Sequence, residues 1–381
     1  MEPRAPLARS PFLWSARTDA LAFGGPAVVA LTLAALAAFV PGLHLRGPLP
    51  PWAWIAFVLL VDVAHVHTTL FRTYLDREEL RRRRALYALS PLAVYAAGVA
   101  LHARSSILFW RVLAYVAVFH FVRQQVGWVS ICRARARETD RAGRLFDHAV
   151  VYVATLYPIV YWHANLPRAF HWFDDDDFVA WPGLAPVVPF LGAAHLALLV
   201  AYLAREGWMW RARGGFTSWG KHLVVLSTAA LWYTGIVATN DDFTFTVTNV
   251  LGHGVPYFVL LWRYASARAA ESASADSPSP RPRTRTLIAA LTGAGVLGFL
   301  VFVFALAFVE EAFWDRLVWH QRPWLFGGVA SESPLFSPLV RALVVPLLSV
   351  PQATHYVLDA VLWRRRDTGP AQAAALGFRS A

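Results

Sequence analysis

The chain has 381 residues, of which 57% are hydrophobic and 15% are charged, and its mean hydropathy is +0.43. A soluble domain of this length needs far more polar surface, so the composition predicts a polytopic membrane protein. The net charge of +11 does not indicate a nucleic-acid partner, because the arginines cluster between apolar segments, where they act as topology signals. The single cysteine, Cys132, excludes an intramolecular disulfide framework and a thiolate metal cluster.

Ten segments are long and apolar enough to cross a bilayer, which takes about 20 residues per helix. They are residues 20–41, 51–71, 85–103, 106–131, 147–163, 184–204, 222–239, 243–263, 287–309 and 338–362. Basic residues crowd every second connection, so ten helices with both termini in the cytoplasm satisfy the positive-inside rule. We therefore expect an all-α membrane bundle in a bacterial-type inner membrane.

The predicted organisation follows from these spans and from one change in composition. We expect a cytoplasmic amino-terminal segment (1–19), an eight-helix core (20–267), a final pair of membrane helices (287–366) and a tail (367–381). A run rich in serine and proline predicts a flexible cytoplasmic linker between the core and that pair, over residues 268–286.

Histidines lie inside five of the spans, at nearly the same depth from a basic boundary. They are His65 and His67, His120, His195, His253 and His355. An ionisable side chain is expensive in a hydrocarbon layer, so such residues usually face a bundle interior and carry function there. We predict metal ligation by His65, His120, His253 and His355. His195 has only apolar neighbours and is the weakest candidate. His67 is about 200° around a regular helix from His65 and is placed near the substrate or at a second metal.

Polar side chains accompany four of these histidines at helical spacing. They are Asp62 before His65, Gln124 after His120, Asn249 before His253 and Asp359 after His355. A metal-bound imidazole usually donates its other N–H to such a group, so we expect these four to orient the ligands. The alternative is that the histidines are hydrogen-bonded across helices and serve packing alone.

A site rich in imidazole suits iron or zinc, and open positions on it favour non-haem iron and O₂ chemistry. The expected function is therefore a metal-dependent membrane oxygenase that acts on a lipid, isoprenoid or carotenoid, with membrane lipids as the other partner. Two alternatives stay open. One is a protein that binds haem b between two histidines, and the other is a proton or solute transporter that uses the polar layer as its path.

Four segments carry a family resemblance in matching order. They are Asp62-Val-Ala-His65-Val-His67, His120-Phe121-Val-Arg-Gln-Gln, His253-Gly-Val-Pro-Tyr257 with Trp262 beyond, and Val350-Pro351-Gln-Ala-Thr-His355 with Asp359 beyond. These resemble the histidine-bearing segments of the Brp/Blh-type membrane β-carotene 15,15′-dioxygenases, with Tyr257 in the place of a second histidine. The resemblance implies one iron bound by histidines and the oxidative cleavage or oxygenation of a long apolar substrate. We place His67 and Tyr257 near that substrate.

Overall fold

The structure is a computed structural model that describes residues 10–273, 287–327, 337–363 and 369–378. Within these ranges the chain forms helices and no β-strand, which confirms the all-α class. In the same ranges, seven helices are long and apolar enough to cross a membrane, judged by length and composition. These helices indicate a helical membrane protein.

The helices of the first part of the chain are α1 (Ala16–Asp19), α2 (Gly25–Phe39), α3 (Pro51–Ala53), α4 (Ala64–Thr68), α5 (Arg77–Arg82), α6 (Arg84–Arg104), α7 (Ser106–Arg135) and α8 (Arg141–Ala164). The later helices are α9 (Val188–Arg213), α10 (Trp219–Trp232), α11 (Asp242–Ala273), α12 (Leu287–Gly293), α13 (Gly295–Trp314), α14 (Pro323–Phe326), α15 (Pro338–Leu348), α16 (Val350–Leu362) and α17 (Pro370–Ala375). Short π-helical segments join α1 to α2 and α3 to α4, so each of these pairs runs as one continuous rod.

All ten predicted spans fall on helices, but the count of ten crossings is not confirmed. The seven helices that qualify cover Ala16–Phe39, Pro51–Arg72, Arg84–Arg104, Ser106–Arg135, Val188–Arg213, Trp219–Ala238 and Gly295–Trp319. Helix α11 is long but is not among them, because Asn249, His253 and several threonines lower its hydropathy. Asn249 and His253, which are predicted site residues, thus lower the hydropathy of the helix that carries them.

The last predicted span, 338–362, differs from the structure. Two helices stand there, α15 and α16, with a break at Ser349. Pro346 lies inside α15 and Pro351 in the first turn of α16, and proline cannot donate the backbone hydrogen bond that a continuous helix needs. The span predicted at 287–309 is also divided, into α12 and α13, where Gly295 adopts a positive φ of 69°.

The predicted linker and tail also differ in extent. Helix α11 continues to Ala273, so the linker does not begin at residue 268, and residues 274–286 lie outside the described residues. The predicted tail contains α17, which packs on α11 and holds Gln372 against Arg72 at 2.9 Å. The amino-terminal segment lies beside it, because the indole nitrogen of Trp14 donates to the carbonyl of Ala375 at 2.7 Å.

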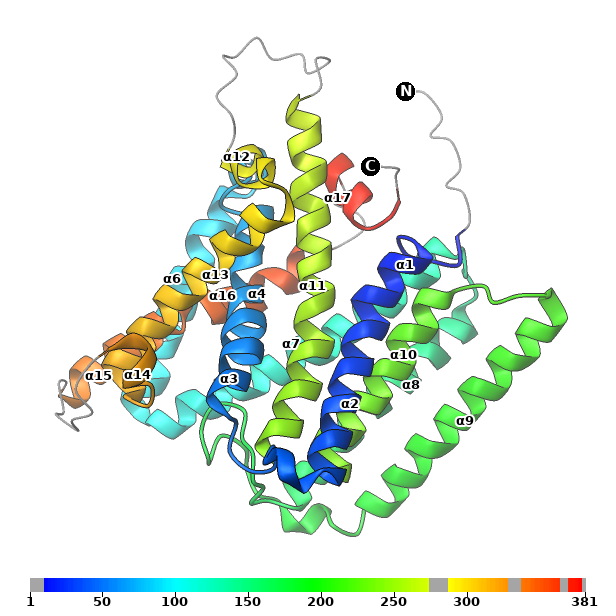
Figure 1. The fold of residues 1–381 in the computed structure, drawn as a ribbon, viewed down its shortest axis with the longest axis horizontal. Coiled ribbons are helices and arrows are strands. Elements are labelled where there is room, and N and C mark those ends of the chain that lie inside the picture. The colour runs from blue at the N-terminus through cyan, green and yellow to red at the C-terminus, as the bar shows by residue number, and fades with distance from the viewer. Residues whose placement is uncertain (1–9, 274–286, 328–336, 364–368, 379–381) are drawn as a thin grey trace.

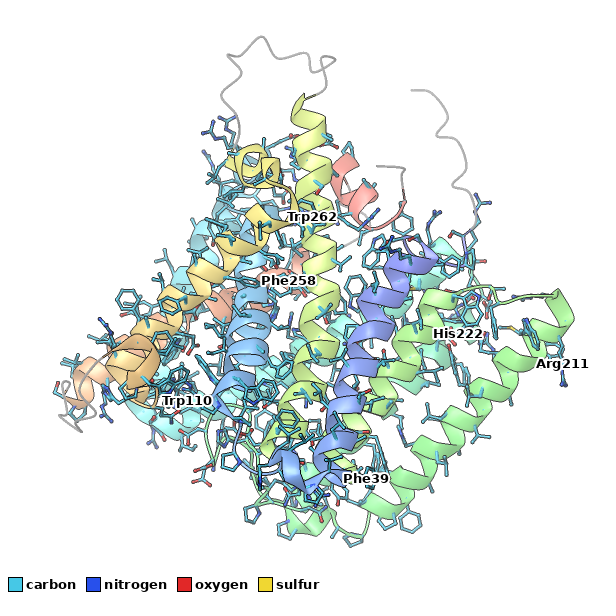
Figure 2. All side chains as sticks on the ribbon, viewed as in Figure 1. Phe39, Trp110, Arg211, His222, Phe258 and Trp262 are labelled. Atoms are coloured by element: carbon cyan, nitrogen blue, oxygen red, sulfur yellow. The ribbon has the colours of Figure 1, made fainter. Side chains whose placement is uncertain are left out.

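Helix α11 is the central element of the bundle (Figure 1) and packs against α2, α4, α10, α12 and α17. It presents Phe258 and Trp262 toward Phe304 and Phe299 of α13 (Figure 2), with ring centroids 6.3 and 5.6 Å apart. Helix α9 lies at the edge of the bundle and exposes apolar side chains such as Phe190. Such outward apolar faces are expected where a helix meets lipid.

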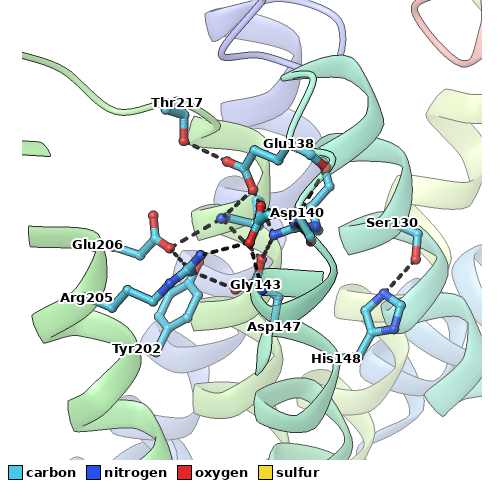
Figure 3. A network of polar contacts seen from close by, with 12 residues as sticks. Ser130, Glu138, Asp140, Gly143, Asp147, His148, Tyr202, Arg205, Glu206 and Thr217 are labelled. Atoms are coloured by element: carbon cyan, nitrogen blue, oxygen red, sulfur yellow. Dashed lines mark hydrogen bonds and ion pairs between the residues drawn. The ribbon is translucent and has the colours of Figure 1, made fainter. Parts of the chain in front are cut away.

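A buried ionic network joins four helices near their arginine-rich ends (Figure 3). Lys221 of α10 is fully buried, and its ammonium lies 2.9 Å from Glu138, 3.3 Å from Asp147 of α8 and 3.3 Å from Glu206 of α9. Arg133 of α7 contacts both Asp147 and Glu138. Because every charge has a partner of opposite sign, the network fixes this end of α7–α10 despite its burial.

Candidate metal centre

The four histidines predicted as ligands lie together in the middle of the bundle. One ring nitrogen from each of them falls within 4.8 Å of the others, and all four residues are buried. His65 comes from α4, His120 from α7, His253 from α11 and His355 from α16. Four segments that are far apart in the sequence thus supply one side chain each to a single cluster.

Two of the nitrogen–nitrogen distances within the cluster are close to those between ligands of one ion. Nε2 of His253 lies 3.1 Å from Nε2 of His65, and Nε2 of His355 lies 3.2 Å from Nε2 of His120. Nitrogen ligands about 2.1 Å from a tetrahedral metal ion are about 3.4 Å from one another. The imidazoles are therefore close to a coordinating arrangement, with their Nε2 atoms turned inward.

A chain of hydrogen bonds fixes the tautomer of His355. The hydroxyl of Tyr257 donates to Asp359 at 3.0 Å, so its oxygen must accept from Thr69, which lies 3.1 Å away. Because the hydroxyl of Thr69 donates its one proton to Tyr257, its oxygen must accept a hydrogen bond from Nδ1 of His355, at 2.7 Å. The proton of His355 consequently sits on Nδ1, and the lone pair of Nε2 faces the cluster.

Two carboxylates stand behind other histidines of the cluster. Asp62 lies 3.8 Å from Nδ1 of His65, and Asp359 lies 3.6 Å from Nδ1 of His120. These separations exceed a hydrogen bond but leave each carboxylate next to a ring that would share the charge of a bound cation. Asp359 was expected to serve His355 of its own helix, and the structure sets it against His120 of α7 instead.

The two amides predicted to orient the ligands are placed differently. Asn249 donates to the backbone carbonyl of Phe245 at 2.9 Å, and its Oδ1 has no hydrogen-bond partner among the described residues. Neither side-chain atom of Gln124 has a hydrogen-bond partner in that part of the chain. Neither amide therefore hydrogen-bonds to a histidine of the cluster among the described residues, although both are buried one helical turn away.

The remaining predicted residues divide between the cluster and its surroundings. Tyr257 lies at the cluster, where its hydroxyl connects Thr69 to Asp359 by hydrogen bonds. His67 is not one of the four, and its Nε2 lies 2.8 Å from a carboxylate oxygen of Glu310 on α13. His195 lies elsewhere, with its ring parallel to that of Tyr233 at 6.0 Å.

Close backbone packing brings α4 and α11 near enough for His65 to meet His253. A Cβ on Gly254 would lie 2.7 Å from Val61 and 3.8 Å from the Cβ of His65, so only glycine fits there without displacement. On the other side of His253, the ring of Phe121 stacks on the imidazole with centroids 3.5 Å apart. Nδ1 of His253 has no hydrogen-bond partner among the described residues, so on that side the ring is oriented by packing.

Some contacts of the site lie beyond the reach of helical spacing. Thr69 follows His65 by four residues on the same helical rod, but its hydroxyl bonds to His355 of α16. Trp363 donates to Asp359 at 2.7 Å, and Glu310 pairs with His67. The Thr69 and Glu310 contacts join separate helices, so spacing within one helix carries no signal for them.

Comparison of the chain with protein-family models, with curated proteins and with solved structures gives no match. The resemblance to membrane carotene dioxygenases therefore stays a prediction.

Proposed function

We propose that the four-histidine cluster binds one metal ion, with iron as the metal that best fits its chemistry. On this proposal the protein is a membrane oxygenase that acts on an apolar, lipid-soluble substrate in a bacterial-type inner membrane. The observation that carries the proposal is the convergence of four buried imidazole nitrogens within 4.8 Å. Neutral nitrogen ligands suit iron and zinc, and a ferrous ion held this way supplies O₂ binding and activation.

The surroundings favour a reactive centre over histidines that serve packing. Asp62 and Asp359 approach two of the imidazoles, and neither has an arginine or lysine within 4.0 Å among the described residues. The side chain of Asp359 is only 9% exposed and that of Asp62 is 29% exposed. A largely buried carboxylate without a cation, such as Asp359, is costly, and a dication in the cluster would offset that cost. The apolar bundle around the site would exclude water and hold a substrate beside the imidazoles.

The geometry also bears on the two alternatives. A haem held by two histidines needs a broad flat space between them, and here two further imidazoles occupy the same few ångströms. A transporter would pass ions along the polar residues without retaining a metal in fixed ratio to protein. The oxygenase and the transporter therefore predict different metal contents for the purified protein.

The test is elemental analysis of the full chain purified in detergent. We expect about one iron per chain in the wild type, and loss of metal in His120→Ala and His253→Ala. His195→Ala is the matched control, since it removes a buried histidine outside the cluster and should keep its metal. Full metal retention in both cluster variants would contradict the ligand assignment, and a Soret band in the wild type would favour haem.

A second measurement tests the reaction class. Iron-loaded protein is incubated with an isoprenoid-rich lipid extract under ¹⁸O₂, and products are analysed by mass spectrometry. We expect label in a lipid product with the wild type and with His195→Ala, and none with His253→Ala. Zinc in place of iron, with no oxygen incorporated, would rule out the oxygenase and leave a metal centre of another kind.

A further inference from the structure

A cavity of about 290 Å³ lies next to the histidine cluster, on the side away from the arginine-rich helix ends. Its outer part is lined by connecting segments that include Leu49, His171 and Gln321. Its inner part is lined by residues of the helices that carry the cluster. Volumes near 300 Å³ and above are typical of small-molecule sites.

The floor of the cavity is one helical turn from the cluster. Asp62, Asn249 and Gln352 line it, and they precede His65, His253 and His355 by three or four residues. One turn of helix corresponds to about 5 Å along the axis. Phe121, whose ring stacks on His253, also lines this floor. None of the four histidines lines the cavity itself, so a molecule in it would lie about one helical turn from the imidazoles.

The walls are aromatic to an unusual degree. Five tryptophans line the cavity: Trp54, Trp110, Trp172, Trp314 and Trp319. Broad indole faces favour flat, unsaturated molecules, which can stack on them or meet them edge to face. A saturated chain could not make these stacking or edge-to-face contacts.

The floor of the cavity offers one buried hydrogen-bond acceptor that has no donor, on the side chain of Asn249. Oδ1 of Asn249 has no partner among the described residues, and Asn249 is only 7% exposed. Asp62 has no arginine or lysine within 4.0 Å in the same part of the chain, and its side chain is 29% exposed. The unsatisfied Oδ1 of Asn249 is costly, so a ligand that donates a hydrogen bond to it would be stabilised here. Arg322, whose guanidinium covers Trp54 at 3.9 Å, also lines the cavity, together with the carboxylates of Asp242 and Glu311.

We propose that this cavity binds the substrate, and that the substrate is a flat unsaturated ring with hydroxyl donors, of the phenol or hydroquinone class. Its ring lies among the tryptophans, and its hydroxyl groups donate to Asn249 and Asp62. This inference rests on the proposed function, because it names the substrate class of the same site. The substrate class proposed here is narrower than the apolar substrate of the proposed function. The end of the molecule that reacts carries a ring with hydrogen-bond donors.

The test compares two probes on the purified full chain by isothermal titration calorimetry. One probe is a hydroquinone with a short alkyl chain, and the other is its dimethyl ether, which has the same ring and no donors. We expect the hydroquinone to bind the wild type about tenfold more tightly than the ether, and Asn249→Leu to lose most of that difference. Asn165→Leu is the matched control, because Asn165 also donates to a carbonyl four residues earlier, at 2.7 Å, but lies outside the cavity.

The outcomes separate this inference from the metal centre. Equal binding of the two probes, tighter binding of an alkylammonium, or no effect of Asn249→Leu would overturn the substrate class. Metal content is measured on the same samples. One iron per chain without hydroquinone binding overturns this inference alone, and hydroquinone binding without metal overturns the metal centre alone.

Discussion

Thr69→Val tests the hydrogen-bond chain that fixes His355. Valine keeps the shape of threonine and removes only the hydroxyl, which lies 2.7 Å from Nδ1 of His355 and 3.1 Å from Tyr257. Loss of a group that orients a metal-bound histidine typically weakens metal affinity by about 10- to 100-fold, or roughly 1.4–2.7 kcal/mol. We expect the variant to fold, because Thr69 contributes no other side-chain hydrogen bond in the described structure.

The assay is competition for ferrous iron against a chelator of known affinity, with thermal unfolding followed in the presence and absence of metal. Metal binding stabilises the folded state by an amount that grows with the logarithm of its affinity, so the increase in Tm on adding metal should be smaller in Thr69→Val. Thr228→Val is the control, since it removes a buried hydroxyl that bonds to Gln125 at 3.1 Å, away from the cluster. Equal metal affinity in the wild type and Thr69→Val would refute the assigned tautomer and the role of Thr69.

Three further predictions follow from other features. Chelation should lower the Tm of the wild type and leave that of His253→Ala unchanged, as measured by thermal unfolding. Gly254→Ala should reduce metal content by forcing α11 away from Val61, whereas Gly207→Ala, where a Cβ has nothing within 4 Å, should slightly raise the Tm. Burial raises the pKa of Glu138, but Lys221 and the other donors outweigh burial and hold that pKa below its usual value. The contribution of the Glu138 carboxylate to stability is therefore complete above about pH 4.3 and is lost as the pH falls further. The Tm difference between wild type and Glu138→Gln should be constant from about pH 7 to 5 and should shrink below about pH 4.

The four-histidine cluster could be predicted because depth in a membrane can be counted from the sequence. Each of these histidines lies a similar number of residues from an arginine-rich boundary, and helices that start at one boundary place equal counts at equal depth. The same reasoning gave His67 and His195 as candidates. It could not reject them, because depth does not determine which way a side chain faces.

The partners of the histidines could be predicted less well. Spacing of three or four residues identifies neighbours on one helix, and it correctly set Asp62 beside His65. It also assigned Asp359 to His355, whereas Asp359 lies nearest to His120 and bonds to Tyr257. Those contacts depend on how α16 is turned against α7 and α11. Helix α16 begins after a break at Ser349, which the count of apolar residues did not reveal.

The carboxylates of Asp62 and Asp359 also affect the charge balance of the cluster with a metal ion bound. Four neutral imidazoles leave both charges of a divalent ion uncompensated, and an isolated charge in a low-dielectric layer is unfavourable by several kcal/mol. Asp62 and Asp359 lie 3.8 and 3.6 Å from the outer nitrogens of two ligands, on different helices, and together they supply two negative charges. The ion and the carboxylates would thus each offset the cost of burying the other. Asn in place of either aspartate would keep its size and lose this balance.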